Sequence, residues 1–147
     1  LRGALAAVNA AIATLGGELI EPTHATPFWD GVRHHDDEFF TKAEAAVQGG
    51  ARLWRLSLPS TTPPLGLPGE QLTEWGGAQR WLCSAAPASL VREAAARAGG
   101  HATLFRGDKS GGVFAPLSAP LQRIHRELKQ SFDPAGLFNP GRLYPDL

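Results

Sequence analysis

The chain has 147 residues with 14 acidic and 14 basic side chains, so its formal net charge at pH 7 is zero. This length supports one hydrophobic core and is short for two. The balanced charge argues against the basic field of a nucleic-acid-binding domain, and a single cysteine excludes an internal disulfide and argues against a cysteine-ligated cluster. No apolar run approaches the roughly 20 residues that a membrane-spanning helix needs.

The first third of the chain predicts helices. Apolar residues recur at steps of four and three from Leu1 to Leu15, which is typical of an amphipathic helix that ends at Gly16-Gly17. A second, shorter helix is predicted to begin at Thr26-Pro27, with the threonine as N-cap. The segment DEFFTKAEAAVQGG predicts one or two further helical turns. The sequence has no methionine, and we expect it to begin partway through a longer protein.

The middle of the chain predicts strands. In ARLWRLSLP, polar and apolar side chains alternate, which indicates a strand with one buried face. STTPPLGLPGE is predicted to be a loop. In QLTEWGGAQRWLCS, Gly76-Gly77 predicts a two-residue hairpin turn between antiparallel strands, and a single longer strand with a glycine bulge is the alternative. We expect Trp54, Trp75 and Trp81 to belong to the core.

The remainder predicts a helix in PASLVREAAARAGG, a fourth strand in HATLFRG, and a last helix from Ser118 as N-cap to Phe132. This order favours an α+β fold with a ferredoxin-like antiparallel sheet of about four strands and helices mainly on one face. The tail FDPAGLFNPGRLYPDL places large apolar side chains between prolines and glycines. Because disordered tails are poor in such residues, we expect this tail to be ordered.

Motifs for phosphate or dinucleotide binding are absent. Adjacent residues of the RHHDDE run would point about 100° apart on a helix, so the run indicates a solvated helix end rather than a metal site. Arg55, Arg80 and His101 lie in predicted strands. Either they face solvent or pair across strands, or they line a pocket in which guanidinium groups bind a small carboxylate. The pattern alone favours the first interpretation.

Several blocks in a fixed order resemble one family. They are LWRLSLPSTTPPLGLPGEQLTEWGGAQRWL, AGGHATLF, FAPLSAPL and LKQSFDPAGLFNPGRLY. These blocks are similar to the C-terminal part of the FAD-binding subunits of bacterial glycolate oxidases (the GlcE type), within the vanillyl-alcohol-oxidase-like flavoproteins. The resemblance implies that residues 1–116 form a cap domain for substrate, and that residues 117–147 form a helix and a segment that returns toward an FAD domain outside this chain.

The resemblance also implies site residues. FAD would be held mostly outside this chain, with Asn139, Gly141 and Arg142 as contacts from the terminal turn, although Asn139–Gly141 could be only a turn. Metal-binding relatives carry a GEHG block where this chain has GGHA, so Gly100 replaces the metal-binding glutamate and we expect no metal site. His101 is then the candidate base for oxidation of glycolate or a similar 2-hydroxy acid. Arg55 and Arg80 are the candidates to bind its carboxylate.

The implied setting is a multi-subunit complex. Its other members would be a sister flavin subunit and an iron–sulfur subunit, in the cytoplasm or associated with the membrane through the complex. An alternative role in the same complex is non-catalytic: binding of FAD, relay of electrons, or assembly. We expect the chain by itself to be inactive and to lack flavin.

Overall fold

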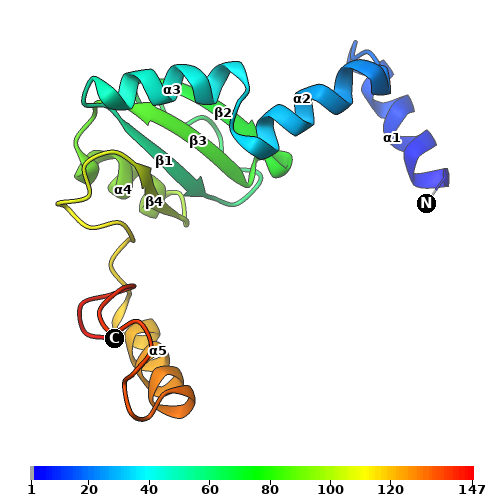
Figure 1. The fold of residues 1–147 in the computed structure, drawn as a ribbon. Coiled ribbons are helices and arrows are strands. Elements are labelled where there is room, and N and C mark those ends of the chain that lie inside the picture. Colours follow the sequence, from blue (N-terminus) through cyan, green and yellow to red (C-terminus); the bar gives the residue numbers. More distant parts are fainter. Residues whose placement is uncertain (1) are drawn as a thin grey trace. The chain divides into compact units, whose positions relative to one another are not determined.

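The computed structural model describes the backbone of residues 2–147 (Figure 1). The chain divides into two compact units, one up to Thr41 and the other from Lys42 to the C-terminus. In the first unit, α1 (Arg2–Thr14) confirms the predicted N-terminal helix, except for Leu1, which lies outside the described residues. Leu5, Val8 and Ile12 of its apolar stripe are all exposed.

The second helix begins earlier than predicted. Helix α2 spans Pro22–His34, so Thr26-Pro27 lies within it rather than at its start. Pro22 occupies the first turn, where no backbone N–H is needed, and this position outweighs the start signal at Thr26. His35 ends the helix with a left-handed φ of 61°.

Helix α3 is longer than the one or two turns predicted. It spans Glu38–Gln48, across the boundary between the two units. The Asp37 carboxylate accepts a hydrogen bond of 3.2 Å from the Phe40 amide, which stabilises the start of the helix. The acidic end of the RHHDDE run therefore starts a helix.

The second unit contains one sheet and confirms the predicted α+β class. Strands β1 (Arg52–Ser57), β2 (Glu70–Glu74), β3 (Gln79–Ser84) and β4 (His101–Arg106) form an antiparallel sheet in the order β2-β3-β1-β4. Strand β3 lies between β1 and β2 and is antiparallel to both, as in a ferredoxin-like sheet. Here the β1–β2 connection is the predicted proline-rich loop, and α4 (Ala88–Arg97) connects β3 to β4.

The β2–β3 hairpin is confirmed, which excludes the single bulged strand, but its turn differs from the prediction. Glu74 pairs with Gln79, so the turn has four residues rather than two. Trp75, Gly76 and Gly77 all have positive φ. This turn leaves Trp75 79% exposed, so the expectation that it belongs to the core was wrong, whereas Trp54 and Trp81 are buried.

The main core lies between one sheet face and α4. Apolar side chains of β1, β3, β4 and α4 form it, together with leucines of the β1–β2 loop: Trp54, Leu56, Leu58, Leu67, Leu82, Val91, Ala94, Ala95, Ala102 and Leu104. Trp81 and Cys83 are buried on the opposite face, where the Cys83 thiol lies 3.9 Å from the Ala43 carbonyl of α3. Figure 1 shows α3 and α4 running along the sheet.

The C-terminal helix and the ordered tail follow the expectation. Helix α5 spans Ala119–Phe132 with Ser118 at the N-cap position, and none of its residues is buried. The tail after it consists of hydrogen-bonded turns. Across residues 2–147, no helix has the length and apolar character needed to cross a membrane.

Candidate functional site

The strand register places Arg55 and His101 on the same sheet face. Arg55 of the central strand β1 lies opposite Thr103 of β4, and Ser57 lies opposite His101. Directly paired residues share a face and side chains alternate along a strand. Arg55 and His101 are therefore diagonal neighbours, which in ordinary sheets are about 7–8 Å apart.

Arg80 lies on the other face of the sheet. It pairs with Leu56, whose side chain is in the core under α4. Arg80 is 7% exposed, and its guanidinium group donates hydrogen bonds to the carbonyls of Thr62, Pro63 and Gly77. The structure therefore brings together two of the three predicted substrate-site residues, whereas Arg80 of β3 is bonded to the β1–β2 loop and the β2–β3 turn.

A cleft of about 710 Å³ opens beside β4. Arg55, His101 and Thr103 line it from the sheet, and Ser118 and Tyr144 line it from the C-terminal part. The cleft therefore combines a cation, an imidazole and hydroxyl groups within a largely apolar lining. This is the usual composition of a site for a small polar ligand.

The Arg55 guanidinium is available for a ligand. Its Nε atom is buried and has no hydrogen-bond partner among the residues that the structure describes. A buried donor without a partner costs free energy, which an anionic ligand would recover. Arg92 also lines the cleft, and its Nε likewise has no partner among the described residues, but its two terminal nitrogens donate hydrogen bonds of 3.0 and 2.7 Å to the carbonyls of Gly111 and Gly112.

The position before His101 has no space for a side chain. A Cβ atom at Gly100 would lie 2.1 Å from the Ser57 carbonyl oxygen of β1. A glutamate here would require β1 and β4 to separate. The glycine of GGHA is therefore required by the close approach of the two strands.

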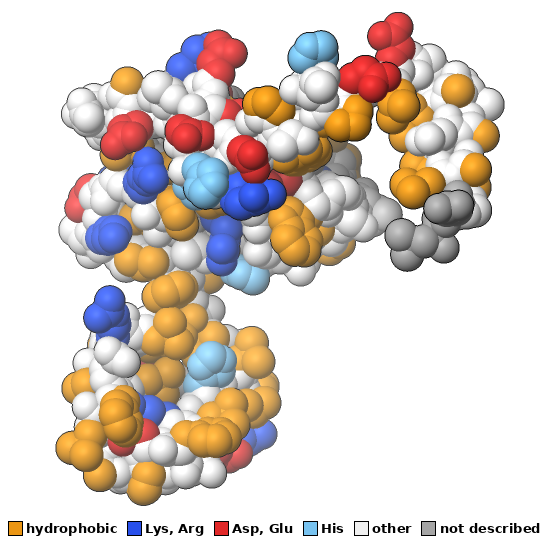
Figure 2. All heavy atoms as spheres, turned by 45° about the vertical axis from the view of Figure 1, so that its right-hand side comes forward, with side chains coloured by type: hydrophobic (Ala, Val, Ile, Leu, Met, Phe, Trp, Pro, Cys, Tyr) orange, Lys and Arg blue, Asp and Glu red, His pale blue; other side chains and the backbone are white. Residues whose placement is uncertain are grey.

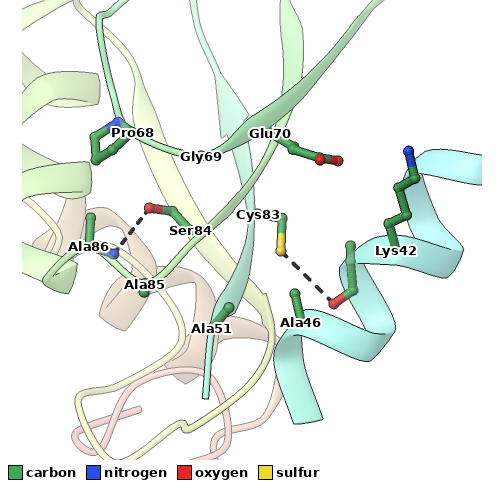
Figure 3. Close-up of a pocket in the computed structure, with 11 residues that line it drawn as sticks. Lys42, Ala46, Ala51, Pro68, Gly69, Glu70, Cys83, Ser84, Ala85 and Ala86 are labelled. Atoms are coloured by element: carbon green, nitrogen blue, oxygen red, sulfur yellow. Dashed lines mark hydrogen bonds between the residues drawn. The ribbon is translucent and has the colours of Figure 1, made fainter. Parts of the chain in front are cut away.

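A second cleft, of about 430 Å³, lies between α3 and the sheet (Figure 3). Five of its eleven lining residues are alanines, and the Cys83 thiol points toward α3. Burial, and secondarily the charge of Glu70, raise the pKa of Cys83. The thiol is thus kept protonated, which does not suit a nucleophile or a metal ligand.

The terminal turn presents the predicted cofactor residues. Asn139 has a left-handed φ of 47°, Gly141 has a φ of 67°, and the Arg142 amide donates a hydrogen bond of 3.2 Å to the Asn139 carbonyl. The Asn139 side chain is exposed and makes no hydrogen bond to any other described residue. An exposed amide with free donors and an acceptor fits the polar edge of a flavin ring.

Among the residues that sequence reasoning missed are the three that bring hydroxyl groups to the main cleft: Thr103, Ser118 and Tyr144. Thr103 could have been found, because it follows His101 by two residues in an alternating strand. Tyr144 carried no such signal. Its hydroxyl donates a hydrogen bond of 3.1 Å to the Ala115 carbonyl, a contact that depends on how the tail folds back.

Comparison with known proteins supports the resemblance seen in the sequence. No protein-family profile matches the chain, and no solved structure does. The chain is 48% identical over all 147 residues to glycolate oxidase subunit GlcE of Escherichia coli strain K12, and spans 38% of the length of that relative. The resemblance expected from the sequence is thereby confirmed: along its whole length, this chain is similar to part of a glycolate oxidase subunit of the GlcE type.

Proposed function

We propose that this chain forms the cap region and C-terminal return segment of a longer flavoprotein that takes part in the oxidation of glycolate, or a similar 2-hydroxy acid, to the 2-oxo acid. The observation that carries the proposal is the placement of Arg55 and His101 on one sheet face beside a common cleft. The similarity to a glycolate oxidase subunit supports the choice of substrate. The cap would comprise residues 1–116 and the return segment residues 117–147.

In this proposal, each residue has a separate role in the cleft. The guanidinium of the half-buried Arg55 binds the substrate carboxylate by charge-assisted hydrogen bonds. His101 accepts the proton of the substrate hydroxyl group on a ring nitrogen. The apolar walls of the cleft exclude water from the charged pair, which strengthens the attraction between them. Arg80 has no part in this arrangement, because its donors are used by loop carbonyls.

The proposed cofactor is FAD, bound mostly by a domain outside this chain. Asn139, with Gly141 and Arg142 beside it, would contact the flavin from the terminal turn. FAD, when bound, would supply the acceptor for the hydride that leaves the substrate carbon. A sister flavin subunit and an iron–sulfur subunit are the proposed partners, in a complex that is either cytoplasmic or associated with the membrane through its other subunits.

The test of the catalytic assignment is turnover of glycolate by the complete complex with substitutions in this chain. Arg55→Ala is expected to raise KM, and His101→Ala to lower kcat by about 100-fold, the usual order for loss of a general base. Arg97→Ala is the matched control, since Arg97 is an exposed arginine of α4 that lies outside the main cleft. Unchanged turnover in both cleft variants, with an intact complex, would contradict the assignment.

One observation favours the alternative of a non-catalytic assembly role. The apolar side chains of α5 are uncovered, with Phe132 82% and Leu128 51% exposed. Exposed apolar residues on one helix commonly mark a surface that meets another domain or subunit. Two results together would favour this assembly role. The complex would dissociate in the Phe132→Ser variant, and the Arg55→Ala variant would oxidise glycolate at the normal rate.

A further inference from the structure

The tail after α5 is held by a buried carboxylate. Asp133 is 8% exposed, and its two oxygens accept hydrogen bonds from the backbone amides of Leu137 (3.0 Å) and Phe138 (2.9 Å). Lys129, one turn earlier in α5, donates to the same carboxylate and also to the Phe138 carbonyl. Both backbone polar groups of Phe138 are therefore fixed, and the next residue is Asn139.

A second carboxylate ties the far end of the tail to α5 in a different way. Asp146 accepts hydrogen bonds from the side chains of Gln122, at 2.9 Å, and Arg126. This side chain is 40% exposed, and these bonds to α5 join side chains rather than the backbone of the turn. The exposed residues Asn139–Arg142 lie between these two attachments.

The conformation of Asn139 needs such support. A left-handed backbone is uncommon for a residue other than glycine and costs free energy unless its surroundings impose it. The Asn139 side chain has no hydrogen bond of its own to any other described residue, so the point and direction from which it leaves the chain are set by the backbone on either side. On the N-terminal side, that backbone is fixed by Asp133.

We propose that Asp133 is a positioning residue for the cofactor: its carboxylate fixes the turn so that the Asn139 amide is presented to the flavin before binding. This inference rests on the proposed function, in which Asn139 contacts FAD. Holding a contact residue in its bound conformation raises affinity, because binding no longer has to order the turn. Asp133 would thus act on FAD affinity without touching the cofactor.

The test is a double-mutant cycle on the longer protein that contains this chain, with the Kd of added FAD measured by quenching of flavin fluorescence. Asp133→Asn keeps the size of the side chain but removes its charge and one acceptor, and should raise Kd by about tenfold. Asn139→Ala should also raise it. If Asp133 acts through Asn139, the double variant should bind FAD within about twofold of Asn139→Ala alone.

Two further variants keep the test decisive. Asp146→Asn is the matched control, because it makes the same change at the other attachment, and it should alter Kd by less than about twofold. Lys129→Gln removes the donor to both Asp133 and Phe138 and should weaken FAD binding in the same direction as Asp133→Asn, so the test survives if the aspartate variant does not fold. Near-ultraviolet circular dichroism of Trp54 and Trp81 reports separately whether the sheet is intact.

The outcomes separate this inference from the proposed function. Additive effects in the double variant, or a normal Kd in Asp133→Asn and Lys129→Gln while Asn139→Ala binds weakly, would overturn the positioning role and leave the flavin contact in place. A normal Kd in Asn139→Ala would overturn both. Equal weakening by Asp133→Asn and Asp146→Asn would show a general loss of tail structure and would also overturn the specific role.

Discussion

The sheet and the C-terminal tail of this protein are stabilised by different forces. In the sheet, Leu82 and Val91 are almost completely buried between the strands and α4. In α5 no residue is buried, and Figure 2 shows hydrophobic side chains on the surface of the C-terminal part. The sheet is thus held by apolar burial, worth about 25 cal/mol per Å², whereas the tail is held by hydrogen bonds, including those that the carboxylates of Asp133 and Asp146 accept. The tail is therefore locally ordered although it has no hydrophobic core.

Truncation of an apolar side chain should show the largest difference between the two regions, because it should lower the free energy of unfolding much more in the sheet than in α5. Leu82→Ala leaves a cavity in the sheet core and should lower the free energy of unfolding by about 2–5 kcal/mol. Leu128→Ala makes the same change in α5, where the side chain is 51% exposed, and should cost less than about 0.5 kcal/mol. Urea unfolding followed by tryptophan fluorescence measures both, and similar costs would contradict the comparison.

Arg80→Ala should show that this arginine supports the fold. Loss of its buried guanidinium removes charge-assisted hydrogen bonds to the carbonyls of Thr62, Pro63 and Gly77, which should cost about 2–3 kcal/mol of unfolding free energy. The same unfolding measurement on Arg97→Ala, an exposed arginine, should show almost no change. If Arg80→Ala had the same free energy of unfolding as the wild type, Arg80 would again be a candidate to bind the substrate carboxylate.

A side chain at Gly100 should disturb the β1–β4 contact. Gly100→Ala brings a Cβ atom against the Ser57 carbonyl and should cost about 1–3 kcal/mol, the usual penalty of overpacking. Gly111→Ala is the control, since nothing lies within 4 Å of its added Cβ. Thermal unfolding by circular dichroism distinguishes them, and a stable Gly100→Glu variant that binds a divalent metal would contradict the account of this position.

Acid should release the tail before it affects the sheet. Hydrogen bonds from Lys129, then from the Phe138 and Leu137 amides, lower the pKa of Asp133 from 3.8 to about 2. Because the folded pKa is the lower one, this stabilisation is present above pH 3.8 and is lost as the pH falls through about 2. The amide proton shifts of Leu137 and Phe138 should titrate with a midpoint near 2 by nuclear magnetic resonance. A midpoint near 4 would mean that the carboxylate is not bonded.

The sequence predicted the sheet better than the turns, for physical reasons. The alternation in ARLWRLSLP shows which face is buried, so the shared face of Arg55 and Ser57 could be predicted. The opposite placement of Arg80 depends on the β1–β3 register, which pairs Arg80 with Leu56. No short turn sets this register, because a loop and β2 separate the two strands in the sequence. The role of Asp133 also lay beyond sequence patterns, because it depends on where the backbone amides of the tail come to lie.

The most direct test of the proposed function is anaerobic mixing of glycolate with the purified flavin-loaded longer protein that contains this chain, without its partner subunits. We predict that substrate bleaches the flavin absorbance near 450 nm, as FAD reduction requires. At glycolate concentrations well below KM, Arg55→Ala should slow the bleaching by about 100-fold, because loss of the carboxylate contact raises KM. If glycolate leaves the flavin oxidised in the wild type and bleaching occurs only when the sister flavin subunit is present, the cleft beside β4 is not the site of oxidation.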